Sequence, residues 1–363
     1  MGFLNNLKRR FMSRRKRRNA ALDERKFTAI HRYELQEDGT AAIVEFVDPE
    51  AESYSVLSEY MGKPVTTMGK EAFYEYSKTR SLKSLTLPDT LTTIEERGLG
   101  ISLDLTTVDV PPSLRSIGIQ AFCMCDKLAA IDLPGVTRIG SLAFSGCSKL
   151  SRVRAESLVE LRDFVFKRCD SLQQFIIPPS LKTMGWNPFL FSPTTLVVPP
   201  GHSFFELADG RLYSKTEHKL ISSPRNNPAR DLNLLPGTLV IGANALSCNS
   251  NLQTAQLGPG LLTIEEAAFS YCSNLYSITL PEGLLTIGPY AFSGCKKLAR
   301  LAIPQSVEYI GKVDFDRNST AFAVHRGSYA EARLRKLIDA YIIEKEIKEA
   351  SVKEKLARLI QVL

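Results

Sequence analysis

The chain of 363 residues lacks features by which several protein classes are recognised. It contains no run of eighteen apolar residues, so no membrane-spanning helix is predicted. Histidine is scarce, and none of the four histidines has a cysteine, histidine or carboxylate at metal-ligand spacing. We therefore expect the histidines on the surface and predict no metal site. These histidines are His31, His202, His218 and His325.

The common signatures of catalysis and cofactor binding are also missing. The sequence has no GxSxG elbow, no HExxH helix and no dinucleotide-binding fingerprint. The seven cysteines include no CxxC pair at zinc spacing, and their odd number does not favour a disulfide framework. We therefore expect a protein that is not an enzyme and that binds no cofactor.

Excess basic charge is confined to the N-terminal end, which we call the basic arm (residues 1–26). The arm holds ten Lys and Arg against two Asp and Glu, whereas the remaining residues hold 36 against 37. A partner attracted by basic charge is therefore a partner of this arm. No apolar core segment follows the basic residues, so we expect no secretory signal peptide and a cytoplasmic location.

The basic arm combines an apolar stripe with its charges, because Phe3, Leu4, Leu7 and Phe11 would share one side of a helix. Such a stripe can insert into an anionic membrane surface, where each basic residue contributes about 1 kcal/mol. The same charges can bind the phosphates of nucleic acid, and a solvated arm without a partner is the third alternative. The basic residues concerned are Lys8, Arg9, Arg10, Arg14, Arg15, Lys16, Arg17 and Arg18.

A period of 22 to 23 residues organises the rest of the chain. The repeated pattern is LxxIxLPxxLxxIGxxAFxxC, and residues 275–295 (LYSITLPEGLLTIGPYAFSGC) show it in full. About ten copies are present. The phenylalanine of the AF pair, or the leucine that replaces it, stands at Phe73, Leu99, Phe122, Phe144, Phe166, Phe189, Leu246, Phe269, Phe292 and Phe315.

Each copy predicts one coil of a repeat solenoid. The LxxIxLP stretch predicts a short strand that the proline ends, the glycine of IG favours a backbone turn, and the AF turn buries its aromatic ring. One copy cannot cover its own apolar face, so the copies must stack. The alanine of the AF pair is replaced at Gly98, Pro188 and Asp314.

Five cysteines occupy one position of the repeat, which favours a row of buried thiols that pack as small apolar groups. Free thiols also suit a reducing compartment better than an exported protein. The five are Cys125, Cys147, Cys169, Cys272 and Cys295.

The repeated motif resembles the BspA-like leucine-rich repeats over about residues 33–330. The resemblance implies a scaffold that binds a partner protein. A cell-surface adhesin and a nucleic-acid-associated protein are the alternatives. The units that we expect are the basic arm (1–26), an N-terminal capping hairpin (27–60), a first block of repeats (61–189), a β-hairpin insertion (190–233), a second block (234–326) and a C-terminal helical cap (327–363).

The concave face of a solenoid is where we expect the partner protein, because that face is extended and rigid. In LxxIxL, alternation along the strand turns the residues on either side of the isoleucine outward. We place these residues on the concave face. The candidates for partner binding are Thr107, Asp109, Asp132, Arg152, Arg154, Gln174, Thr254, Gln256 and Arg300.

The C-terminal residues predict two helices that cover the open end of the solenoid. Ser328 with Glu331, and Ser351 with Glu354, have the spacing of capping boxes. The last helix, predicted over 347–363, extends beyond what a cap needs, so we hypothesise that it pairs with another protein or with a second copy as a homodimer. Its apolar residues at helical spacing are Leu356, Leu359, Ile360 and Leu363.

Overall fold

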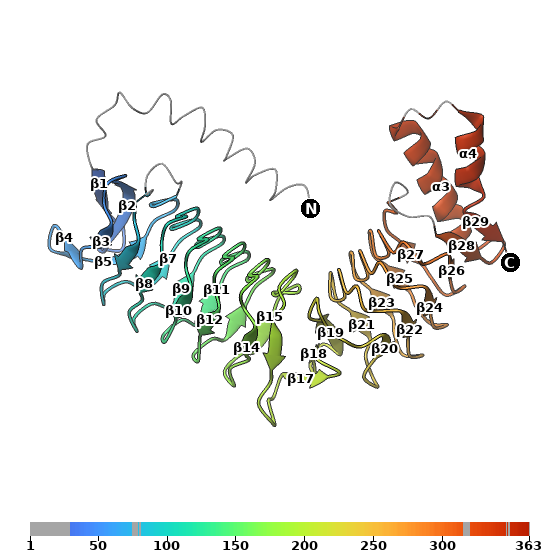
Figure 1. Cartoon of the computed structure of the whole chain (residues 1–363), viewed down its shortest axis with the longest axis horizontal. Helices are drawn as coiled ribbons and strands as arrows, with labels where there is room; N and C mark the ends of the chain where they lie inside the picture. The colour runs from blue at the N-terminus through green and yellow to red at the C-terminus, as the bar shows by residue number, and fades with distance from the viewer. Residues whose placement is uncertain are drawn as a thin grey trace.

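A computed structural model describes residues 30–74, 79, 81–314, 320–345, 347 and 349–362. The chain is a solenoid whose two blocks meet at an angle, so that the molecule forms an open arc (Figure 1). We call the junction of the two blocks the elbow. The basic arm, with all the residues predicted to contact a membrane or nucleic acid, lies outside the described residues.

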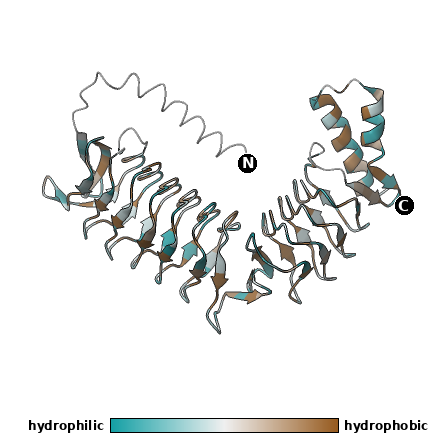
Figure 2. Cartoon of the chain, viewed as in Figure 1, coloured by the Kyte–Doolittle hydropathy of each residue, from teal (hydrophilic) through white to brown (hydrophobic). Residues whose placement is uncertain are grey.

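Each coil contains a three-residue strand, a two-residue strand and the turn built on the AF pair. Hydrophobic and hydrophilic segments alternate along the coils (Figure 2). In the first block the three-residue strands are β6 (Ser84–Thr86), β8 (Thr107–Asp109), β10 (Ala130–Asp132), β12 (Arg152–Arg154), β14 (Gln174–Ile176) and β16 (Thr195–Val197). The two-residue strands are β7 (Thr93–Ile94), β9 (Ser116–Ile117), β11 (Arg138–Ile139), β13 (Glu160–Leu161) and β15 (Thr183–Met184).

The second block repeats this arrangement. Its three-residue strands are β20 (Asp231–Asn233), β22 (Thr254–Gln256), β24 (Ser277–Thr279) and β26 (Arg300–Ala302). Its two-residue strands are β21 (Val240–Ile241), β23 (Thr263–Ile264), β25 (Thr286–Ile287) and β27 (Tyr309–Ile310). Within each block the two-residue strands pair in parallel into one continuous sheet, but in the described chain no strand pairing joins β15 to the second sheet.

A hairpin covers the first edge of the stack. Strands β1 (Ile30–Leu35) and β2 (Ala41–Val47) are antiparallel, and Gly39 takes a φ of +82° in the turn between them. Strand β2 then pairs in parallel with β5 (Lys63–Met68), which starts the sheet of two-residue strands. The short strands β3 (Ser53–Ser55) and β4 (Glu59–Tyr60) complete this end.

The insertion at the elbow is a three-stranded antiparallel unit. Its strands are β17 (Phe205–Ala208), β18 (Arg211–Ser214) and β19 (Lys219–Ser222), and β19 pairs in parallel with β21. Strands β16 and β20 belong to the repeat stacks, so the inserted unit is shorter than the 190–233 expected.

His202, expected on the surface, is buried next to this unit, because its ring is part of a local hydrogen-bond network. Its Nδ1 accepts from the backbone N–H groups of Phe204 and Phe205, both at 3.2 Å. Its Nε2 lies 3.0 Å from the Pro178 carbonyl oxygen. The histidine therefore has a structural role at the entry to the insertion.

The core consists of repeated side chains that stack from coil to coil. The rings of Phe122 and Phe144 are 5.0 Å apart, those of Phe144 and Phe166 are 5.6 Å apart, and both pairs are stacked. The cysteines of the repeat are buried beside them, as predicted, but they also donate hydrogen bonds. The Sγ of Cys147 donates to the carbonyl oxygen of Phe122 in the preceding coil at 3.1 Å.

The glycine of IG and the residue at the alanine position have structural roles that the sequence did not indicate. The glycine of IG is needed for close approach of neighbouring coils, since a Cβ on Gly118 would lie 2.6 Å from the backbone of Glu95. The alanine position supplies a carbonyl to the preceding coil, as when Phe166 N–H donates to Pro188 oxygen at 2.8 Å. Proline keeps its carbonyl, so Pro188 preserves the stack.

Helix α3 (Tyr329–Glu344) covers the end of the second block, with Ala330, Leu334 and Ile338 buried. The Ser328 side chain accepts from Glu331 N–H, as the capping box predicts. The second predicted box is wrong: helix α4 (Ala350–Ala357) begins after Glu349, and Ser351 lies inside it.

The last residues form a strand instead of continuing the predicted helix. Strand β29 (Ile360–Val362) pairs in parallel with β28 (Ala321–Val324), which pairs with β26. Leu356 and Ile360 are each 8% exposed, since they pack into the second block's own core. These two side chains are therefore covered by their own chain, and a homodimer through this segment stays a prediction.

Candidate partner-binding face

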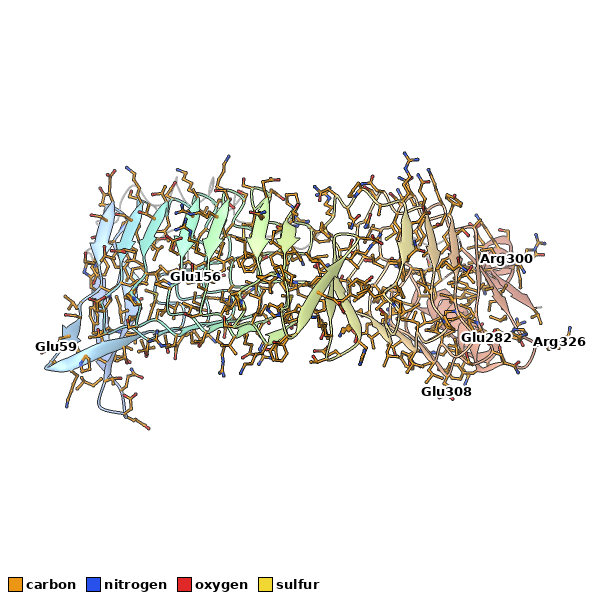
Figure 3. The ribbon with its side chains drawn as sticks, turned by 90° about the horizontal axis from the view of Figure 1, so that it is seen from below. Glu59, Glu156, Glu282, Arg300, Glu308 and Arg326 are labelled. Atoms are coloured by element: carbon orange, nitrogen blue, oxygen red, sulfur yellow. The ribbon has the colours of Figure 1, made fainter. Side chains whose placement is uncertain are left out.

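The AF turns form the concave face of the solenoid. They lie along the inner side of the arc, whereas strands β10, β12, β22 and β24 lie toward its outer side (Figure 1). In the view from below, Glu156, which follows β12, lies in the middle of the opposite, convex face (Figure 3). The expectation that the LxxIxL strands line the concave face is therefore wrong.

Backbone hydrogen bonds join successive coils at the AF turns and at the strands. Neighbouring AF turns are joined by short backbone bonds, such as Phe122 N–H to Ala143 oxygen at 2.7 Å and Met124 N–H to Ser145 oxygen at 2.8 Å. The three-residue strands instead pair in separate groups of two or three strands. Within each block the bonds between AF turns thus continue from coil to coil, whereas the pairing of the three-residue strands is interrupted.

The candidate residues of the strands lie on a flank of the solenoid, and all of them except the half-buried Thr254 are exposed. Their outward orientation is as predicted, although their location is not. Among them, Arg152 and Asp132 form an ion pair at 3.8 Å in which each side chain is about half exposed. Such a solvated pair contributes little to stability, and its role in binding stays a prediction.

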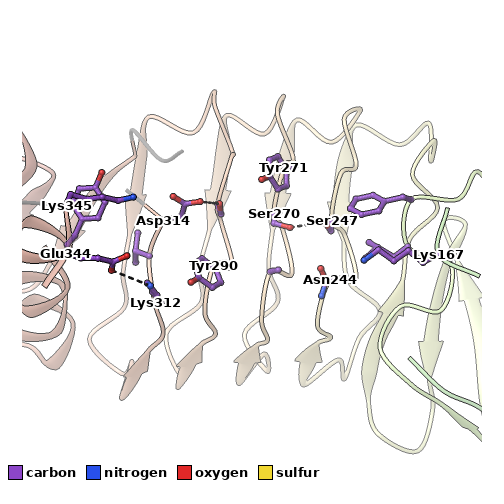
Figure 4. Close-up of a pocket in the computed structure, with 16 residues that line it drawn as sticks. Lys167, Asn244, Ser247, Ser270, Tyr271, Tyr290, Lys312, Asp314, Glu344 and Lys345 are labelled. Atoms are coloured by element: carbon purple, nitrogen blue, oxygen red, sulfur yellow. Dashed lines mark hydrogen bonds and ion pairs between the residues drawn. The ribbon is translucent and has the colours of Figure 1, made fainter. Parts of the chain in front are cut away.

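An open trough of about 570 Å³ follows the concave face from the elbow to helix α3 (Figure 4). Its floor is a row of serines, and Ser247 and Ser270 lie 2.8 Å apart in it. At the α3 end Lys312 pairs with Glu344 at 3.7 Å. The larger side chains that line the trough are Lys167, Phe191, Tyr271, Tyr290 and Tyr341.

Tyr271 gives the trough an exposed aromatic surface. Its side chain is 38% exposed, and its ring lies over Gly294 of the next coil, where a Cβ would come within 2.9 Å of the ring. A tyrosine that is apolar on its face and polar at its tip is typical of protein-binding surfaces. The trough therefore offers the aromatic and hydroxyl groups on which a partner segment can rest.

At the elbow end, two cations pack against phenylalanine rings; we call Phe164, Lys167, Arg168 and Phe191 the elbow cluster. The Nζ of Lys167 lies 5.4 Å from the ring centre of Phe164 and 5.7 Å from that of Phe191. The Cζ of Arg168 lies 5.5 Å from the ring centre of Phe191. Burial lowers the pKa of Lys167, and the charge of Arg168 lowers it further.

The elbow cluster has no acidic partner among the residues that the structure describes. Neither Lys167 nor Arg168 is within ion-pair distance of a described carboxylate. Asp163, one residue before Phe164, accepts a hydrogen bond from the backbone N–H of Trp186 at 2.8 Å. Within the described residues, two neighbouring cations of the concave face thus lack a counter-charge.

Arg97, on the concave face of the first block, shows the opposite arrangement. Its Nη1 contacts Glu71 at 3.0 Å, its Nε donates to Gln120 at 2.8 Å, and its guanidinium lies 5.7 Å from the ring centre of Tyr74. The hydrogen bond to Glu71 is the main cause of the raised pKa of Arg97. The concave face is therefore charge-neutral at Arg97 and positive at the elbow.

The backbone of the AF turns explains why this face was missed in the sequence. Phe164, Arg168 and Phe191 have left-handed backbones with φ of 56°, 59° and 65°. Such a φ usually indicates glycine, yet here side chains occupy these positions in coil after coil. Since the conformation recurs along the solenoid, it belongs to the architecture of the turn, and it carries these residues on the inner side of the arc.

The remaining chemistry of the described residues is structural. All seven cysteines are free of disulfides, and burial raises the pKa of Cys123 to about 11 and that of Cys295 to about 12. Such thiols stay protonated near neutral pH, where they are poor nucleophiles. The described residues contain no cluster of three or more His, Cys, Asp or Glu that could hold a metal ion. No helix in this part of the chain is long and apolar enough to span a membrane.

Two solved structures share this fold. The pneumococcal vaccine antigen PcpA is 24% identical, with 82% of this chain and 81% of that chain covered and a TM-score of 0.69. A leucine-rich cell surface protein of Faecalibacterium prausnitzii A2-165 is 23% identical, with 85% and 97% covered and a TM-score of 0.55. The comparison with curated proteins gave no match.

A family model identifies the repeats directly. The model of the BspA-type leucine-rich repeat region, with six copies, matches residues 66–195 and 228–322. The gap between the two matched ranges contains the inserted strands β17, β18 and β19 at the elbow. Since the matched ranges include more than half of the sequence, the chain belongs to the BspA-type leucine-rich repeat family.

Proposed function

We propose that this protein is a non-enzymatic scaffold that binds a partner protein in the trough of its concave face. The observation that carries the proposal is the open trough of about 570 Å³, which extends over several coils and ends at helix α3. A groove of this length fits an extended segment or an edge of another protein better than a small molecule, which a more closed pocket would surround.

The composition of the trough supports this proposal. Three tyrosines and Phe191 supply contact area at low conformational cost, and serine hydroxyls and Asn244 supply hydrogen bonds. The hydrogen bonds between AF turns hold these groups at fixed spacing before a partner arrives. Binding to such a preorganised surface costs less conformational entropy than binding to a mobile loop.

Photo-cross-linking at single positions tests the proposal. Benzoylphenylalanine replaces Tyr271 in the trough, Gln174 on the flank or Glu156 on the convex face, and each variant is irradiated in cells. We expect one dominant protein adduct from position 271 and a much weaker yield from the other two positions, because only the trough contacts the partner. The adducts are measured by blotting and identified by mass spectrometry.

Three outcomes contradict the proposal. Equal adducts at all three positions would mean that cross-linking is unspecific, and no protein adduct at position 271 would mean that the trough is empty in cells. A dominant adduct at position 174 would instead assign binding to the strand flank that the sequence predicted. As a control, Tyr290→Ala within the trough should reduce the adduct at position 271.

A cell-surface binding protein is the second candidate, because one structural neighbour is described as a leucine-rich cell surface protein. The free, buried thiols instead suit a reducing compartment such as the cytoplasm, and we favour that location. Fractionation of tagged full-length protein into cytosol, membrane and medium separates the two candidates. Contact of the basic arm with an anionic membrane or nucleic acid stays a prediction, since the arm is outside the described residues.

A further inference from the structure

We infer that the elbow cluster binds an acidic segment of the partner protein, whose carboxylates lie against Lys167 and Arg168. This inference rests on the proposed function and adds to it the chemistry of the bound segment. The cluster lies where the trough begins, because Lys167 and Phe191 both line the trough. A segment that lies along the trough therefore comes close to the two cations at its elbow end.

The two cations need a counter-charge that the described part of the chain does not provide. Lys167 is half-buried between two phenylalanine rings, and burial of an ammonium group without a carboxylate is unfavourable. The rings compensate in part through cation–π attraction. A carboxylate placed at the elbow would compensate further, as Glu71 does for Arg97.

The geometry also favours a carboxylate over a neutral ligand. Arg168 offers a planar fork of donors whose carbon lies beside the ring of Phe191, and such a fork matches the two oxygens of a carboxylate. The chain's own basic arm is excluded as the occupant because its net charge of +8 would repel the cluster. The occupant therefore belongs to another protein.

The test uses the full-length protein and a fluorescein-labelled poly-glutamate peptide, with poly-glutamine of equal length as the neutral probe. Binding is measured by fluorescence anisotropy for the wild type and two double variants. Lys167→Gln with Arg168→Gln removes the elbow charges, and Lys149→Gln with Lys297→Gln removes the same charge from exposed positions on the strand flank, outside the trough. We expect the elbow variant to bind about tenfold more weakly and the flank variant to stay near the wild type.

Three further measurements make the result unambiguous. Lys167→Arg with Arg168→Lys keeps both charges and should retain most of the affinity, which separates loss of charge from loss of folding. A benzoylphenylalanine in the poly-glutamate probe should cross-link to the elbow cluster, as mapped by mass spectrometry. The wild-type affinity should also fall with added salt.

The inference is overturned if both double variants bind poly-glutamate equally, or if the cross-links map to residues 1–26 alone. Equal binding of poly-glutamine would overturn it as well, because charge would then have no part in recognition. These failures leave the proposed function intact, since a partner could still bind the trough through a neutral segment and form the adduct at position 271.

Discussion

At the scale of single residues, the cysteines of the repeat act as hydrogen-bond donors between coils as well as apolar groups. Each reaches back to a carbonyl of the preceding coil, and Ser192, at the same repeat position, donates to Phe166 oxygen at 2.6 Å. We expect Cys147→Ala to lower the free energy of unfolding by about 1–2 kcal/mol, through the lost sulfur contacts and hydrogen bond. Urea denaturation measures this change.

Cys147→Ser is the matched control, because its hydroxyl keeps a donor at the same place. It should cost less than Cys147→Ala if the hydrogen bond to Phe122 matters. A serine variant less stable than the alanine variant would show that the thiol acts through packing alone.

At the scale of elements, the two C-terminal helices differ in how they begin. Ser328 forms a helix N-cap at α3, whereas the capping-box spacing at Ser351 does not correspond to an N-cap at α4. The Ser328 oxygen accepts from Glu331 N–H at 3.2 Å, whereas Ser351 lies within α4 and caps nothing. Ser328→Ala is therefore expected to cost about 1 kcal/mol, and Ser351→Ala less than about 0.5 kcal/mol. Thermal and urea unfolding of both variants measure the difference. Equal losses would mean that the Ser328 bond does not stabilise α3.

At the scale of the whole molecule, the elbow divides the solenoid into two cores. Buried side chains group into one cluster that ends near Ile221 and another that begins at Tyr213. A side-chain amide takes part in the link between the blocks: Asn187 Nδ2 donates to Asn244 oxygen, and Asn187 Oδ1 accepts from Ser222 Oγ, both at 2.7 Å. Coupling across the elbow should therefore be weaker than coupling within a block.

This division predicts a local effect of core mutations. Phe144→Ala removes a ring from the first block's stack and should cost about 3–5 kcal/mol. Hydrogen exchange should then show lost amide protection in the first block and little change in the second. Phe269→Ala should give the reverse pattern. Equal loss in both blocks after either mutation would show that the solenoid unfolds as one unit.

The repeat pattern of the sequence is enough to define one coil. A period of 22 to 23 residues with fixed leucine, isoleucine, phenylalanine and cysteine positions decides which side chains are buried, because one coil alone cannot cover them. The strands, the phenylalanine stack and the cap at Ser328 could be predicted for this reason. The capping box predicted at Ser351 was wrong because the spacing of its residues does not show where a helix begins.

Which side of the coils is concave, and which side chains meet on that side, follows from the tertiary structure. Curvature depends on how closely successive coils approach on opposite sides, and a single repeat does not encode that difference. The elbow cluster joins residues of different coils, since Lys167 and Arg168 of one coil meet Phe191 of the next. Phe164, Arg168 and Phe191 have left-handed backbones without being glycines, so no local signal indicated the turn that presents them.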